Sequence, residues 1–207
     1  MDGSELMALL VNAKSAVCSV QCTGVTRARD VPPGAYEWES TWTTWQTSDG
    51  RYRLERAKGI TYFDGRTCWT VLADGAKAFR NPIPLPSLLG EAISPPWLHS
   101  DVNLVDLGET VNEGRSCRSV DARTTDGELH YSLTVDQATG LILESRDERT
   151  GREFELHDVA VNVDIDESRF RPELGPDVTI VEPPTRGQNL AFLARIAARS
   201  IFRRRTR

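Results

Sequence analysis

The sequence predicts a mainly β, α+β fold, in which a curved antiparallel sheet forms an incomplete β-barrel with an N-terminal helix and a short helical plug or lid. From about residue 19 to residue 164 the chain alternates apolar and polar residues in short runs, which are separated by Asp-Gly, Asn-Glu-Gly and Thr-Gly turn signals. Helical periodicity is confined mainly to residues 4–17 and to the C-terminal end. Many strands with few helices are typical of a large antiparallel meander.

The first element is an amphipathic helix over residues 4–17. Ser4 is the expected N-cap, because a serine hydroxyl accepts a hydrogen bond from an unpaired backbone N–H of the first turn. The helix places one apolar face toward the sheet, formed by Leu6, Leu9, Leu10, Ala13 and Val17.

About ten strands follow. The segment 36–45 illustrates their pattern, because Tyr36, Trp38 and Trp42 share one face while Trp45 lies on the other, mostly polar face. A strand with one apolar face is half-buried in a sheet that has one wet side. The expected strands are 19–28, 36–46, 51–57, 60–63, 67–73, 102–107, 116–123, 128–136, 141–148 and 152–164.

Residues 79–101 interrupt the meander with five prolines in an otherwise apolar segment. Proline is excluded from central strands, so this segment leaves the sheet. We expect it to pack on the sheet as a lid or plug with short helical turns; the alternative is a surface crossover. Because the few helices cannot cover a broad flat sheet, the sheet is expected to curl around them and to leave a cavity.

The uneven distribution of charged residues along the chain predicts its domain organisation. Residues 186–207 contain seven arginines and no acid, whereas the chain as a whole has 25 basic and 30 acidic residues. We therefore expect a single domain over 1–185 and a basic C-terminal helix or tail over 186–207.

Three interpretations of the tail stay open: a helix on an anionic membrane surface, a nucleic-acid contact, which the acidic body disfavours, and a solvated disordered end. The tail residues concerned are Arg195, Arg199, Arg203, Arg204 and Arg205.

The sequence as written predicts a cytoplasmic protein, peripheral to a membrane if the tail binds lipid. Its start is acidic, and Asn12 and Lys14 interrupt the apolar run that a signal peptide would need. No apolar run reaches the length of a spanning helix. A mis-chosen start codon would hide a leader.

Signatures of catalysis are absent from the sequence. It contains no nucleophile elbow, P-loop, HExxH or dinucleotide fingerprint, its three histidines are scattered, and its four cysteines form no CxxC pair. We therefore expect a protein that is not an enzyme and has no metal or cofactor.

Several stretches carry a resemblance to a known family. They are SDGRYRLE, GITYFDGRTCW, NEGRSCRSVDA and, most specifically, the patterns VD–TGL–L and V–VN–ID–F within residues 135–170. Over roughly residues 4–182 the chain resembles the LolA/LolB/RseB-like superfamily, together with related actinobacterial lipid-binding lipoproteins. The resemblance implies an incomplete barrel with helices over its concave side and an apolar cavity.

In function, the resemblance implies binding of a lipid, acyl chain or lipoprotein, or else regulatory protein interaction of the RseB type in a sigma/anti-sigma pathway. The missing leader and the basic C-terminal helix depart from the family. The expected partners are an apolar ligand, an anionic membrane surface through the tail and a protein, but no nucleic acid. The cavity candidates are Tyr36, Trp38, Trp42, Leu54, Trp69, Tyr131 and Leu133, with Trp97 and Leu98 closing the cavity. The alternative is that these side chains simply fill the core.

Overall fold

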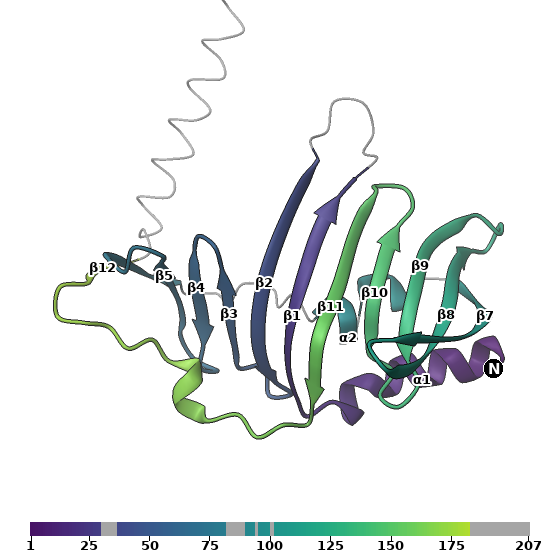
Figure 1. The fold of residues 1–207 in the computed structure, drawn as a ribbon, viewed down its shortest axis with the longest axis horizontal. Coiled ribbons are helices and arrows are strands. Elements are labelled where there is room, and N and C mark those ends of the chain that lie inside the picture. Colours follow the sequence, from purple (N-terminus) through teal and green to yellow (C-terminus); the bar gives the residue numbers. More distant parts are fainter. Residues whose placement is uncertain (30–36, 82–89, 94, 100–101, 183–207) are drawn as a thin grey trace, which may run out of the picture.

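A computed structural model of the protein describes residues 1–29, 37–81, 90–93, 95–99 and 102–182. In these ranges twelve strands form one sheet, in the order β12-β6-β5-β4-β3-β2-β1-β11-β10-β9-β8-β7. Figure 1 shows a broad curved sheet that is not closed into a barrel, with α1 crossing one end of it. The expected fold class is therefore confirmed.

The N-terminal helix α1 spans Gly3–Ala16. Its N-cap is Asp2 rather than the expected Ser4. The Asp2 carboxylate accepts hydrogen bonds from the backbone N–H groups of Ser4 and Glu5, and the Glu5 side chain accepts one from the N–H of Asp2. This reciprocal capping box satisfies the free donors of the first turn, so the helix begins one residue earlier than expected.

Two meanders make up the sheet. The first contains β1 (Ser19–Ala28), β2 (Trp38–Thr47), β3 (Tyr52–Arg56), β4 (Gly59–Phe63), β5 (Cys68–Leu72) and β6 (Lys77–Asn81). The second contains β7 (Val102–Asn112), β8 (Arg115–Thr124), β9 (Leu129–Asp136), β10 (Ile142–Asp147) and β11 (Arg152–Val161). Antiparallel pairing of β1 with β11 joins them along a central seam.

Two strands were not expected from the sequence. Strand β6 extends to Asn81, so the segment 79–101 leaves the sheet three residues later than expected. Strand β12 (Thr179–Val181) pairs with β6, and this pairing is parallel. The sheet therefore departs from a purely antiparallel meander at its β12 edge.

The core lies between one face of the sheet and three helices, which are α1, α2 (Gly90–Ile93) and the 3-10 helix η1 (Pro96–His99). We call this face the helix face and the other the outer face. Ala92, Trp97 and Leu98 are buried against the sheet, so the described part of 79–101 packs as the lid or plug alternative predicts. From α1, Leu6 and Leu10 enter the same core.

The segment after β11 crosses the outer face of the first meander. It contains the 3-10 helix η2 (Glu167–Phe170), whose Phe170 is buried beneath the guanidinium of Arg51. This segment then leads to β12 at the far edge (Figure 1). No helix in the described ranges is both long enough and apolar enough to cross a membrane.

Candidate ligand-binding site

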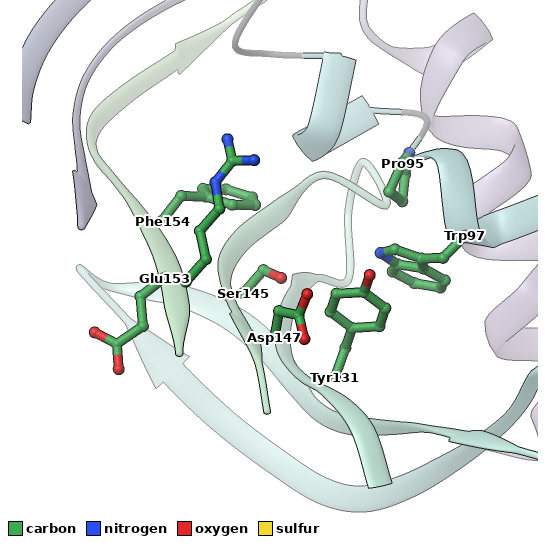
Figure 2. Close-up of a pocket in the computed structure, with 8 residues that line it drawn as sticks. Pro95, Trp97, Tyr131, Ser145, Asp147, Glu153 and Phe154 are labelled. Carbon is green, nitrogen blue, oxygen red and sulfur yellow. The ribbon is translucent and has the colours of Figure 1, made fainter. Parts of the chain in front are cut away.

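A pocket of about 200 Å³ lies between η1 and the helix face of β9, β10 and β11. Eight residues line it: Pro95, Trp97, Tyr131, Ser145, Asp147, Arg152, Glu153 and Phe154. Figure 2 shows Pro95, Trp97 and Tyr131 on one side of the pocket and Phe154 on the other, with Ser145 and Asp147 between them. The pocket thus has walls from both the plug and the sheet.

Aromatic side chains form its apolar part. The indole of Trp97 stacks on the ring of Tyr131, with centroids 5.1 Å apart and ring planes inclined by 24°. Phe154, which is largely buried, lines the pocket from β11. Rigid rings of this size wall a space without collapsing into it.

Polar groups form the other part. Ser145 lies opposite Phe154 in the register, and Asp147 lies opposite both Arg152 and Tyr131. One carboxylate oxygen of Asp147 accepts hydrogen bonds from the backbone N–H groups of Arg149 and Thr150, at 3.0 and 3.3 Å. Because these donors lie in the β10–β11 turn, the turn fixes the Asp147 side chain at the edge of the pocket.

Glu153 borders the pocket, but its carboxylate points away from Trp97 and Tyr131 (Figure 2). On the outer face it lies between Arg27 at 2.5 Å and Arg146 at 2.7 Å. Burial raises the pKa of Glu153, but the two guanidinium groups outweigh burial and leave the pKa below its ordinary value. Glu153 is therefore a charged structural residue and does not act on a ligand in the pocket.

Trp42, a sequence-predicted cavity residue, lies in a different environment. Its ring packs on Gly24, where an added Cβ would lie 2.4 Å from Cζ2 of the indole. Its Nε1 donates a 3.0 Å hydrogen bond to the hydroxyl of Thr26. Trp42 is thus held on both its apolar and polar sides by β1, and it does not line the pocket under η1.

The remaining candidates are dispersed. Leu54, Leu98 and Leu133 are buried in the common core. Trp38 shares the face of Trp42 but is 45% exposed at the start of β2. Tyr36 and the tail residues Arg195, Arg199, Arg203, Arg204 and Arg205 lie outside the described residues. Of the predicted set, the structure brings Trp97 and Tyr131 together at one pocket.

The placement of Trp69 corrects the expectation that it faces the cavity. The register pairs Trp69 with Tyr62, Tyr62 with Arg53 and Arg53 with Trp45. Directly opposed residues in neighbouring strands share a face, so Trp69 lies with Trp45 on the outer face. Its side chain contacts the guanidinium of Arg80 there.

Sequence reasoning missed Pro95, Ser145, Asp147, Arg152 and Phe154. A signal for Phe154 and Ser145 exists in the alternation of the last two long strands, since Phe154 and Leu156 alternate with charged residues. In the described part of the chain no three histidine, cysteine or acidic side chains gather in a way that would hold a metal ion.

No protein-family model matches the chain, and no curated protein is significantly similar to it. Solved structures are similar in fold. A chain of the Pseudomonas aeruginosa MucA/MucB complex superimposes with a TM-score of 0.55 and 24% identity, over 87% of this chain and 64% of that one. LprF from Mycobacterium bovis gives a TM-score of 0.52 and 11% identity, over 84% and 99%.

An uncharacterized conserved protein from Thermus thermophilus gives a TM-score of 0.52 and 13% identity, over 87% of this chain and 99% of that one. At these identities the similarity establishes the fold alone, which this chain shares with MucB and LprF, as the resemblance in the sequence implies. The chain spans about two thirds of the length of MucB, at 65% of that chain.

Proposed function

We propose that this protein is a non-enzymatic binding protein that takes an acyl chain, or another narrow apolar group, into the pocket beneath η1. The observation that carries the proposal is the pocket between stacked Trp97 and Tyr131 on one side and Phe154 on the other. Apolar walls with a few polar groups at one side are the usual features of ligand sites.

The shape of the pocket argues for an amphiphile. At about 200 Å³ it lies below the range of about 300–1,000 Å³ that encloses a drug-sized ligand, so it takes a segment of a lipid rather than a whole molecule. Ser145, Asp147 and Arg152 offer hydrogen-bonding groups of both charges beside the apolar walls. A polar headgroup would meet these side chains while the chain end enters between the rings.

Mass spectrometry of protein purified from its host without detergent tests the proposal, and a co-purifying lipid is the expected result. In vitro, a fluorescent fatty acid should bind the delipidated protein saturably. Ser145→Phe fills the pocket from its floor and should abolish this binding, whereas Ser116→Phe, on an exposed position of β8, should leave it unchanged. Saturable binding of equal strength by a folded Ser145→Phe protein would contradict the pocket assignment.

A second candidate is regulatory protein interaction of the RseB type, since MucB of similar fold is known in complex with MucA. In this chain the specific observation is the edge strand β7, which exposes Val105, Leu107 and Val111. An unpaired edge with apolar side chains is suited to strand addition by a partner. A photo-crosslinker at Val111 should then capture a protein, while one at Ile180, also exposed on an edge strand, should not; capture at neither position would reject this candidate.

A further inference from the structure

The outer face of the first meander carries a row in which arginines and aromatic residues occupy one line across five strands. Its members are directly opposed neighbours in the register: Trp45 on β2, Arg53 on β3, Tyr62 on β4, Trp69 on β5 and Arg80 on β6. We call it the arginine–aromatic row. It lies on the opposite side of the sheet from the pocket under η1.

Each arginine of the row stacks on a ring. The guanidinium carbon of Arg53 lies 5.5 Å from the ring centroid of Trp45 and 5.1 Å from that of Tyr62, and Arg80 lies 5.8 Å from Trp69. Cation–π contacts at these distances hold guanidinium groups flat and in place. A guanidinium fixed in this way loses little conformational entropy when it binds an anion.

The segment after β11 adds a further guanidinium to the row. Arg169 of η2 lies over the indole of Trp45, at 4.7 Å from its centroid. Arg53 and Arg169 therefore share one indole, although they come from residues far apart in the sequence. Arg169 forms no salt bridge within 4.0 Å among the described residues, although the hydrogen bonds from Ser168 and then the charge of Arg169 lower the pKa of the Asp166 carboxyl.

Beside the row the surface is hollowed over about 500 Å³. The lining residues are Arg53, Tyr62, Asp166, Ser168, Arg169, Arg171 and Glu173. The three arginines carry one charge more than the two acids, although the chain as a whole has a formal net charge of -5. The lining of the hollow thus carries a net positive charge, although Glu55 and Asp64 beside it pair with Arg53 and Arg171.

The contacts that the lining residues already make leave hydrogen-bond donors available to a ligand. Arg53 is paired with Glu55 through Nε at 2.8 Å, and Asp166 accepts the backbone N–H of Ser168 at 2.8 Å. Arg171 is 72% exposed, with Asp64 3.7 Å from its Nε. The guanidinium of Arg169 and most donors of Arg171 therefore remain available to a bound group.

Tyr62 adds a neutral donor. Burial raises the pKa of its phenol above the ordinary value, although the charge of Arg53 opposes this effect. The hydroxyl therefore keeps its proton at neutral pH and does not repel an anion.

We propose that this hollow binds a compact oxyanion, the phosphate group of a small molecule or of a lipid headgroup, between Arg169 and Arg171 with Arg53 behind them. Guanidinium forks match the oxygen spacing of phosphate and bind it through paired, charge-assisted hydrogen bonds. Because the surrounding protein is acidic, recognition depends on these direct contacts and not on long-range attraction.

The experiment is a calorimetric titration of the full chain with inorganic phosphate at low ionic strength. We expect saturable binding with a Kd of about 1 mM. Arg171→Gln, at a side chain that is 72% exposed, should weaken binding about tenfold. Arg169→Lys keeps the charge but loses the fork, and should also weaken it. Arg149→Gln, which makes the same charge change on an exposed turn, is the control and should bind as the unaltered protein does.

Vesicle flotation distinguishes the source of the phosphate. The site would be assigned to a lipid headgroup if the protein binds phosphatidylcholine vesicles only when they contain phosphatidic acid and if Arg171→Gln abolishes this binding. Saturable binding of inorganic phosphate without vesicle binding would assign it to a soluble ligand. If neither probe binds, or if Arg171→Gln and Arg149→Gln weaken binding equally, the proposal is wrong.

Discussion

The indole of Trp97 lies stacked on the ring of Tyr131, so that the plug and the sheet meet through two flat surfaces 5.1 Å apart between centroids. This contact joins η1 to β9 and forms the wall of the proposed binding pocket. A change to either ring therefore affects both the attachment of the plug and the shape of the pocket.

Replacing Trp97 with leucine keeps an apolar side chain but removes the flat wall. We expect binding of a fluorescent fatty acid to weaken about tenfold, which corresponds to about 1.4 kcal/mol. Trp69→Leu removes an indole from the outer face and should leave binding unchanged. Fluorescence titration measures both, with circular dichroism to verify that each variant is folded. Equal affinity in the two variants would count against a pocket at η1.

Gly24 is required by the ring of Trp42. Alanine at this position would place Cβ 2.4 Å from the indole, so Gly24→Ala should lower the free energy of unfolding by about 1–3 kcal/mol. The control is Gly175→Ala, where no atom lies within 4 Å of the added Cβ. Urea denaturation measures the difference. Combining Gly24→Ala with Trp42→Leu should cost less than the sum of the two single changes, because the clash is then relieved; strict additivity would disprove the contact.

Arg115 neutralises a buried carboxylate. Asp136 is only 2% exposed and lies 2.7 Å from Arg115, whose guanidinium also donates to the carbonyl of Val159 at 2.6 Å. Arg115→Ala leaves the buried Asp136 carboxyl without this partner, and should cost about 3–5 kcal/mol of stability. Arg29→Ala breaks the exposed pair with Glu39 and should cost less than about 1 kcal/mol. Thermal denaturation compares the two, and similar costs would show that burial does not decide the strength of these pairs.

The cysteines should differ sharply in reactivity. Burial raises the pKa of the Cys22 thiol to about 12, whereas Cys18 is exposed. Alkylation of the native protein near pH 9 should therefore modify Cys18 and spare Cys22, and urea should make both reactive. Fast modification of Cys22 in the native protein would show that its thiol is accessible to solvent and would contradict this prediction.

The same shift has a consequence for stability. A thiol whose pKa is raised on folding contributes its stability fully below its ordinary value near 9, and loses it as the pH rises toward the folded value. The free energy of unfolding should fall above pH 9, and Cys22→Ala should reduce that slope relative to the unaltered protein. If the slope is unchanged in Cys22→Ala, the fall in the free energy of unfolding above pH 9 comes from other groups.

The sequence predicts correctly the face of a side chain where that face is set by neighbouring residues, and less well where it depends on pairing between strands. Alternation within 36–45 correctly separates Trp42 from Trp45, because the two-residue period is local. The prediction for Trp69 was wrong because its face depends on the register through three turns between β2 and β5, and a slip of one residue reverses the face. Trp38 has the expected face, but its exposure depends on its place at the end of a strand.

Only two residues of the candidate pocket were predicted from the sequence, and its third aromatic wall, Phe154, was missed. Trp97 and Tyr131 are conspicuous in the sequence as bulky residues on a plug and on an alternating strand. Asp147 and Arg152 flank a Thr-Gly turn, and their residue types equally suit a solvated hairpin end. The arginine–aromatic row is likewise invisible in the sequence, since its members lie on five separate strands.

The central seam also bears on how the protein folds. Both meanders consist of neighbouring hairpins whose strands lie close in sequence, whereas β1 meets β11 through contacts such as that of Thr23 with His157, 134 residues away. Loop closure over that length is entropically costly, and contacts of large sequence separation slow folding. The half of the sheet that carries the pocket and the half that carries the arginine–aromatic row are thus expected to form as separate kinetic units, and closure of the seam is the slow step that makes them one body.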